Sequence, residues 1–186
     1  MRPFYRASDY NMKNSVGYLI RRTSNLMLPQ MEALFEDAAL TFSQWTALMA
    51  LREWGNTSAV QLARDICHDT GSLTRILDEL EERGLVARTR NETDRRSVTV
   101  SLTSQGLALV EMLLPRVVEH WNTLLGDFSH MEIKLLIKLL TRVTVATAGR
   151  RDERDPRFQK RQEKLAAHLA RPNDQHERRG RRGRHP

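Results

Sequence analysis

The sequence holds a single cysteine, Cys67, in 186 residues. One thiol cannot form an internal disulfide, and chains without disulfides are typical of a reducing compartment. The sequence also lacks an apolar run long enough to span a bilayer, and its N-terminus has no signal-peptide core. We therefore expect a soluble, cytoplasmic protein that does not interact with membranes.

The residue patterns of catalysis are also missing. The chain has no nucleophile motif, no glycine-rich phosphate loop and no paired carboxylates in an apolar setting. Its six histidines and one cysteine are scattered without the close spacing expected of metal ligands. The sequence therefore predicts a protein that is not an enzyme and needs neither a metal nor a cofactor.

Most of the chain lacks a net charge, and the excess of positive charge lies at its C-terminal end. Residues 1–148 hold 17 basic and 17 acidic residues, whereas residues 149–186 hold 13 basic and 6 acidic ones, which is the whole net charge of +7. The terminal ERRGRRGRHP run has no apolar residue to bury, so we expect disorder from residue 149 onwards. Such a tail is either a solubilising extension or a sequence-independent phosphate-binding arm.

The stretch from Ser58 to Thr103 carries the clearest pattern. Two short amphipathic segments are separated by a turn at Cys67-His68-Asp69, and the second segment ends at Gly84, a residue suited to a left-handed helix end. Two alternating runs follow, joined by the polar loop 91–96. This order predicts a helix-turn-helix followed by a β-hairpin. The apolar residues of the second helix, at helical spacing, are Leu73, Ile76, Leu77 and Leu80.

Charge is unevenly distributed along this second helix. Its four carboxylates, Asp78, Glu79, Glu81 and Glu82, lie in the C-terminal half. A helix that inserts its positive N-terminal end into a major groove keeps such acids away from DNA. The candidate DNA-contacting residues are therefore those of the N-terminal half: Thr70, Gly71, Ser72, Thr74 and Arg75.

The hairpin supplies four arginines, Arg88, Arg90, Arg95 and Arg96, within nine residues. Arginine on a narrow protruding loop suits the minor groove, where width and electrostatic potential are recognised. Taken alone, the helix and the loop could each be an ordinary solvated charged surface. Together, with their basic ends adjacent, they predict binding to double-stranded DNA.

These segments resemble the MarR family of winged helix-turn-helix transcriptional regulators over roughly residues 15–147. The resemblance rests on LTFSQWTALMAL, SAVQLARDI, LTRILDELEERGLVAR and DRRSVTVSLTSQG. The family's D-x-R wing motif is present as Asp94 and Arg96, and its L-T-x-x-G motif as Leu102, Thr103 and Gly106. The chain departs from the family at Cys67-His68, where a glycine and a small apolar residue are usual, and in its basic tail.

The helices outside this stretch carry long apolar stripes. A helix from Val16 to Ala38 contains Pro29, which should kink it or split it in two. Thr41 with Gln44, and Ser129 with Glu132, are capping boxes that begin further helices. The stripes exceed what a small DNA-binding head can cover, which favours a homodimer over a monomeric bundle. The resemblance implies that the terminal helices form the interface, with the candidates Val16, Leu19, Leu113, Val117, Trp121, Leu136 and Leu140.

We accordingly expect a mainly α fold with a small β-hairpin wing and four regions. These are an N-terminal dimerisation region (1–40), a winged helix-turn-helix head (41–102), C-terminal dimerisation helices (103–148) and a basic tail (149–186). A two-fold dimer would place two recognition helices roughly 34 Å apart, on a pseudo-palindromic operator. Such a dimer would repress transcription by blocking a promoter. The alternative function is non-specific or architectural nucleic-acid binding through the arginine-rich tail.

The resemblance further implies a pocket for a small aromatic or phenolic effector that releases the DNA. Residue types that could line it are Tyr18, Arg22, Trp45, His68 and Trp121. Cys67 could be considered as a redox sensor, but a sensing thiol needs a resolving partner and the chain has no second cysteine. We interpret Cys67 as a small apolar residue of the turn.

Overall fold

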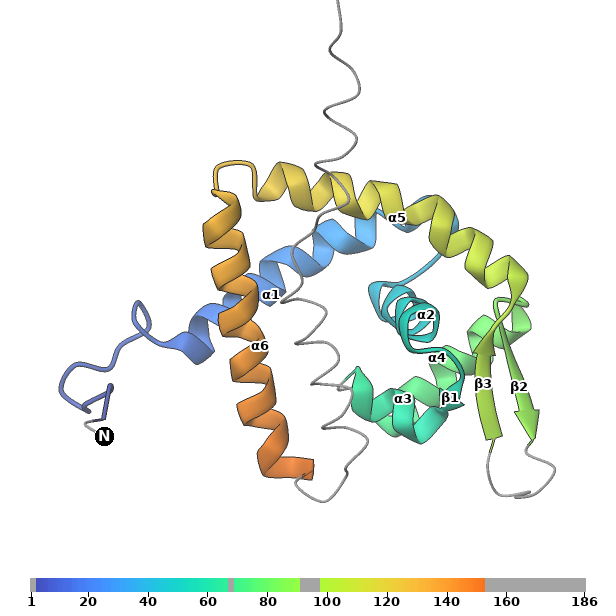
Figure 1. The fold of residues 1–186 in the computed structure, drawn as a ribbon, viewed down its shortest axis with the longest axis horizontal. Coiled ribbons are helices and arrows are strands. Elements are labelled where there is room, and N and C mark those ends of the chain that lie inside the picture. The colour runs from blue at the N-terminus through green and yellow to red at the C-terminus, as the bar shows by residue number, and fades with distance from the viewer. Residues whose placement is uncertain (1–2, 67–68, 91–97, 153–186) are drawn as a thin grey trace, which may run out of the picture. The chain divides into compact units, whose positions relative to one another are not determined.

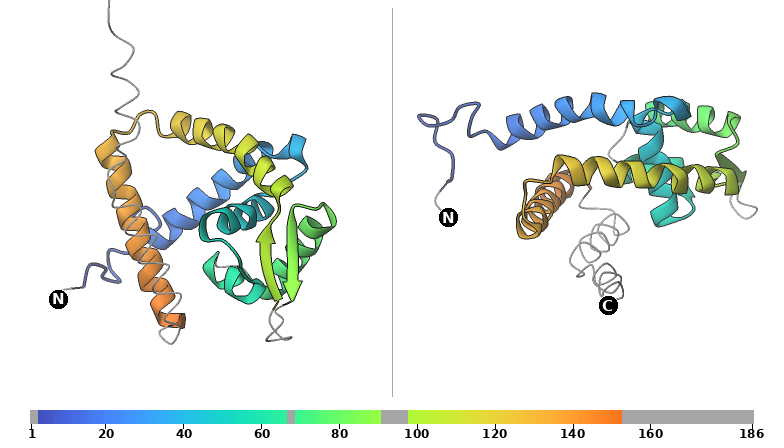
Figure 2. Two further views of the ribbon diagram at one scale, coloured as in Figure 1. Left: turned by 45° about the vertical axis from the view of Figure 1, so that its right-hand side comes forward. Right: turned by 90° about the horizontal axis from the view of Figure 1, so that it is seen from above.

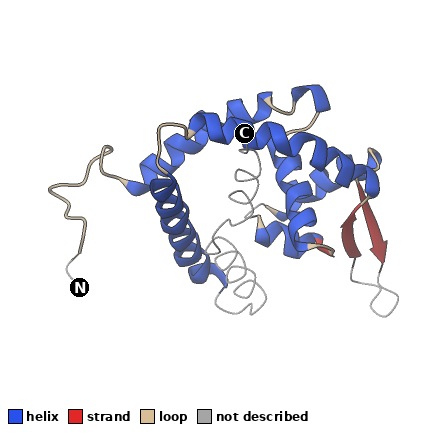
Figure 3. Ribbon diagram, turned by 45° about the horizontal axis from the view of Figure 1, so that its top comes forward, coloured by secondary structure: helices blue, strands red, loops and turns tan. Residues whose placement is uncertain are grey.

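The structure, a computed structural model, describes residues 3–66, 69–90 and 98–152 (Figure 1). It is mainly helical with one small antiparallel sheet, which confirms the predicted fold class (Figure 3). The chain divides into two compact units, Met1–Trp121 and Asn122–Pro186. The elements are α1 (Val16–Ala33), the 3₁₀ turn η1 (Glu36–Ala38), α2 (Phe42–Trp54), β1 (Thr57–Ser58), α3 (Ala59–Asp65), α4 (Thr70–Glu82), β2 (Val86–Arg90), β3 (Val98–Leu102), α5 (Ser104–Leu124) and α6 (His130–Asp152).

The sheet has the order β1-β3-β2, and both pairs are antiparallel. Strands β2 and β3 form the predicted hairpin, in which Arg88 pairs with Val100, and they lie side by side in the left view of Figure 2. Strand β1 was not predicted, because two residues are too short to show an alternating pattern. Its Thr57 pairs with Val100 from the other side, so β3 is the central strand.

The hydrophobic core of the first unit lies between α2, α4 and the sheet, closed by the C-terminal end of α1 and by α5. Helix α4 contributes Leu73, Leu77 and Leu80, which are fully buried as its spacing predicts, while Ile76 is only partly buried. Phe35, after α1, stacks on Trp45 of α2 with ring centroids 5.0 Å apart. Helix α4 is therefore supported along one whole face by the core.

The predicted helix starts are confirmed by their hydrogen bonds. Thr41 and Gln44 form both halves of a capping box at α2. Ser58 accepts from the backbone N–H of Gln61, 3.2 Å away, and so caps α3 while also pairing as the last residue of β1. Ser129 and Glu132 cap α6 in the second unit, where hydrogen bonds from the Ser129 hydroxyl and backbone N–H lower the pKa of Glu132.

The first helix differs from the prediction at its C-terminal end. Pro29 does not split α1, which is continuous from Val16 to Ala33. Pro29 removes one backbone hydrogen bond and its ring crowds the preceding turn, yet the helix continues for four residues beyond it. The helix also stops before Ala38, since the chain tightens into η1 and Ala39 adopts a left-handed backbone with φ of 49°.

Candidate DNA interface

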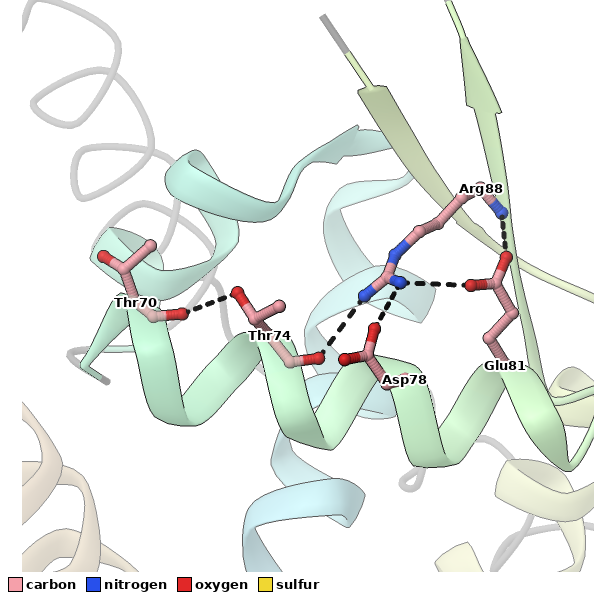
Figure 4. A network of polar contacts seen from close by, with 5 residues as sticks. All are labelled: Thr70, Thr74, Asp78, Glu81 and Arg88. Atoms are coloured by element: carbon pink, nitrogen blue, oxygen red, sulfur yellow. Dashed lines mark hydrogen bonds and ion pairs between the residues drawn. The ribbon is translucent and has the colours of Figure 1, made fainter.

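The N-terminal half of α4 is exposed along its outer side. Asp69 caps the helix, and its Oδ2 accepts from the backbone N–H of Ser72 at 2.8 Å. The Thr74 hydroxyl donates back to the carbonyl of Thr70 at 2.9 Å, which keeps that short side chain against its own helix (Figure 4). The structure thus gathers on one exposed helix end all five predicted contact residues, Thr70, Gly71, Ser72, Thr74 and Arg75.

The C-terminal half of the same helix is attached to three neighbouring elements. Glu79 accepts a hydrogen bond from Gln44 of α2 at 2.7 Å. Arg83, just after the helix, donates to the carbonyls of Ala38 and Ala39 at 2.8 and 2.7 Å. These side chains hydrogen-bond to other elements of the fold, although Glu79 also remains exposed to solvent. The sequence alone did not reveal the bond between Gln44 and Glu79 or the bond between Arg83 and Ala39. The two residues of each pair are 35 or more positions apart in the chain.

Arg88 of β2 supplies the third attachment (Figure 4). Its Nη1 donates to Asp78 and, at 3.1 Å, to Glu81, and its Nη2 donates to the carbonyl of Thr74 at 3.4 Å. Its backbone N–H donates to Glu81 as well, at 3.2 Å. The side chain is only 24% exposed. The predicted contact of Arg88 with DNA is not tested by this arrangement, but its cation is already engaged by two carboxylates.

The L-T-x-x-G motif holds the end of α4 against the start of α5. The Thr103 hydroxyl donates to the carbonyl of Gly84 at 2.7 Å, and Thr103 N–H donates to the carbonyl of Leu85 at 3.1 Å. Gly106 N–H in turn donates to the Thr103 hydroxyl at 3.0 Å. A Cβ on Gly106 would lie 2.1 Å from the Leu85 oxygen, so only glycine allows this approach. Gly84 itself has a φ of 67°, as predicted for the helix end.

Several predicted residues lie outside the described part of the chain. These are Asp94, Arg95 and Arg96 of the wing loop and Cys67 and His68 of the turn. Arg90 ends strand β2, but its side chain is not described. Among the described residues, no group of three or more His, Cys, Asp or Glu side chains is placed to hold a metal ion. None of the described helices combines the length and apolar character that crossing a bilayer requires.

The described candidates for an effector pocket lie in different settings. Arg22 donates to the Tyr18 hydroxyl at 3.3 Å on the exposed side of α1. Trp45 is a core residue stacked on Phe35, and Trp121 packs against the edge of the core with His120 beside it, ring centroids 5.9 Å apart. Of the pocket candidates, the structure therefore shows Tyr18 and Arg22 in direct contact with each other.

The dimer candidates separate into two groups. Leu113 and Val117 are buried in the core of the first unit, where they serve the fold of a single chain. Val16 and Leu19 of α1 are exposed, and so are Leu136 and Leu140 of α6. Trp121 is partly buried against the core.

Known proteins share this architecture. The sequence model of the MarR family matches residues 40–98. The organic hydroperoxide resistance transcriptional regulator of Bacillus subtilis is 32% identical over 115 residues, which cover 62% of this chain and 76% of that protein. The family match spans the helix-turn-helix and strand β2 and ends at the first residue of β3.

Two solved structures show the same fold. Bordetella bronchiseptica BpsR, described in a study of how 6-hydroxynicotinic acid regulates its DNA binding, superposes with a TM-score of 0.66 at 29% identity over 73% of this chain and 96% of that one. A mutant of MarR from E. coli, in complex with operator DNA, gives 0.64 at 28% identity over 73% and 97%. By sequence and by structure, this chain belongs to the MarR family of winged helix-turn-helix transcriptional regulators.

Proposed function

We propose that this regulator binds a pseudo-palindromic operator as a homodimer, represses transcription there, and is released by a small aromatic ligand. The proposed DNA contact is inferred from the difference between the two halves of α4. Its C-terminal half is attached to η1, α2 and β2, whereas its N-terminal half exposes small polar residues and Arg75. An exposed helix N-terminus also presents the positive end of the helix dipole.

The dimer is supported by exposed apolar side chains within each unit. Val16 and Leu19 of α1 are 48% and 46% exposed, and Leu136 and Leu140 of α6 are 42% and 44% exposed. Regularly spaced apolar residues on a helix surface favour burial against a partner.

The oligomeric state is tested by analytical ultracentrifugation of the full chain, which should give twice the chain mass of 21.6 kDa. Leu136→Glu with Leu140→Glu should shift it to the monomer, whereas a stable dimer of that variant would exclude this interface.

Sequence-specific binding is tested by selecting bound duplexes from a random pool. We expect the full chain and a chain ending at Ala148 both to recover one inverted repeat, with half-sites about one helical turn apart. Recovery of no motif by either, with binding lost on truncation, would instead assign the nucleic-acid binding to the arginine-rich tail. Ser72→Ala and Arg75→Ala should then relax the sequence choice at the recovered half-site.

Release by a ligand is supported by BpsR, whose DNA binding is regulated by 6-hydroxynicotinic acid. Arg22, paired with Tyr18 on α1, offers a cation of the kind that binds an aromatic carboxylate. A panel of phenols and aromatic acids, 6-hydroxynicotinic acid included, should contain a compound that lowers the affinity for the operator in a fluorescence anisotropy titration.

Repression is tested with a reporter gene placed behind the recovered repeat. The expression of this gene should fall when the protein is produced in the same cells.

A further inference from the structure

The four contacts of Arg88 join two elements that are expected to address different grooves of DNA. Its side chain starts from β2, two residues before that strand ends at Arg90, and reaches the middle of α4 (Figure 4). There it binds Asp78, Glu81 and the carbonyl of Thr74. We call this group the Arg88 cluster. Thr74 is itself one of the candidate DNA-contacting residues, so the cluster begins where the exposed half of α4 ends.

The geometry of the cluster fixes both position and orientation. Glu81 accepts from the Arg88 backbone N–H with Oε1 at 3.2 Å and from its guanidinium with Oε2 at 3.1 Å. A planar guanidinium that donates in several directions restricts rotation as well as distance. Glu81 thereby fixes the backbone of β2, and Asp78 and Thr74 fix the direction in which the side chain leaves the strand.

The charges of the cluster argue against a role as a free cation. Two carboxylates contact one guanidinium, which leaves the cluster with a net negative charge. To reach a phosphate, Arg88 would have to leave both carboxylates, and these would then stand unneutralised near DNA and repel its backbone. A DNA-bound state that keeps the cluster intact avoids both costs.

We propose that Arg88 is a positioning residue, which holds the recognition helix and the wing strand in one relative orientation and does not contact DNA. The proposal rests on the proposed function, since it assigns how the two DNA-contacting elements are aligned. It also replaces the direct DNA contact that the sequence suggested for Arg88. The two roles predict effects of opposite sign, which makes them separable.

The decisive variant is Asp78→Asn with Glu81→Gln, tested in the full chain on the selected repeat and on a random-sequence duplex. Removing two negative charges should strengthen general attraction to DNA. If Arg88 positions the two elements, affinity for the repeat nevertheless falls about tenfold, roughly 1.4 kcal/mol, while affinity for the random duplex stays equal or rises. Tighter or unchanged binding to the repeat would overturn the proposal, because it would mean that a released Arg88 serves DNA equally well or better.

Glu82→Gln is the matched control, since Glu82 is exposed on the same helix outside the cluster. It removes a carboxylate near the same end of α4 and should leave the preference for the repeat over the random duplex unchanged. Thermal unfolding followed by circular dichroism shows that each variant is folded before its affinity is compared.

The second measurement is the salt dependence of binding by Arg88→Gln. A lost phosphate contact would make the log–log slope shallower by about 0.9, and would do so on any duplex. A positioning residue instead weakens binding to the repeat about tenfold without that change in slope. A slope reduced by about 0.9 on both duplexes would overturn the proposal.

Failure of the proposed function would look different. The unmodified protein would then show no preference for any sequence, whatever happened at Arg88. The salt slopes on the random duplex would still report whether Arg88 contacts phosphate, so the two failures are distinguishable.

Discussion

The two halves of α4 have the same backbone and share one buried face, yet their outer sides serve different purposes. The N-terminal half presents small polar residues and Arg75 to solvent. Its Asp69 and Thr74 side chains bond within the helix and its cap, and the Thr74 carbonyl accepts one bond from Arg88. In the C-terminal half, Asp78, Glu79 and Glu81 have partners on β2 and α2. The comparison teaches that acidic residues on a recognition helix can orient it, in addition to being kept away from DNA.

The largest effect should come from the attached end of the helix. Gly106→Ala places a methyl group 2.1 Å from the Leu85 oxygen, so the start of α5 must move away from the end of α4. We expect the free energy of unfolding to fall by about 3 kcal/mol, the upper range for overpacking. Chemical denaturation measures it. Gly17→Ala in α1, with open space around it, is the control and should be neutral or slightly stabilising.

Substitutions in the exposed N-terminal half of α4 should change DNA binding and leave the stability of the fold unchanged. Arg75→Ala removes an exposed side chain without a core contact, so the unfolding midpoint should stay within error of the parent protein. Discrimination between the selected repeat and the same repeat with one changed base pair should fall by about 1–3 kcal/mol. Competition binding with the two duplexes measures this difference. A loss of stability instead of discrimination would show that Arg75 belongs to the structural half.

Asp69 lies at the boundary between a structural and a DNA-contacting role. Its carboxylate caps α4 by accepting from Ser72 N–H, so Asp69→Ala should cost about 1 kcal/mol of stability. Asp69→Asn retains an accepting oxygen and should recover most of that loss. Thermal unfolding of the two variants tests the cap, and equal destabilisation by both would show that the charge rather than the hydrogen bond matters.

The smallest effect concerns the turn that receives Arg83. Arg116 of α5 donates two hydrogen bonds to Asp37 in η1, at 2.8 and 2.7 Å, and lowers the pKa of that carboxyl below its ordinary value. A carboxyl with a depressed folded-state pKa stabilises the protein above its unfolded pKa, and the contribution is lost as the pH falls through the folded value. Stability should therefore decrease slightly more below about pH 4 in the parent protein than in Asp37→Asn. Urea denaturation at pH 7 and pH 3 compares them.

Local patterns in the sequence were enough to predict the capping boxes, the hairpin, the family and the helices, except for the C-terminal end of α1. Spacing of three and four residues identifies the buried Leu73, Leu77 and Leu80, and a capping box such as Thr41 with Gln44 is complete within four residues. These features depend on neighbours close in sequence, so they can be inferred without knowing the fold.

Contacts between distant residues could not be inferred in the same way. The bond from Gln44 to Glu79, the ion pairs of Arg88 and the bonds of Arg83 to η1 form only once the elements are packed. Pattern reasoning assigned Leu113 and Val117 to a dimer stripe, because an apolar stripe does not reveal which part of it is covered within one chain. The partners of Arg88 could not be predicted for the same reason. The sequence does not show whether acidic side chains face an arginine that lies near a loop.

Strand β1 has a consequence for how the chain folds. Thr57 and Ser58 pair with Val100 and Thr99, so this short pairing encloses the entire helix-turn-helix and hairpin in one loop. Closing so long a loop costs more entropy when the enclosed chain is disordered than when its helices and hairpin have already formed. We therefore expect the start of α3 to be secured to the sheet only after the elements between them have become ordered, so that the winged helix-turn-helix is completed as one cooperative unit.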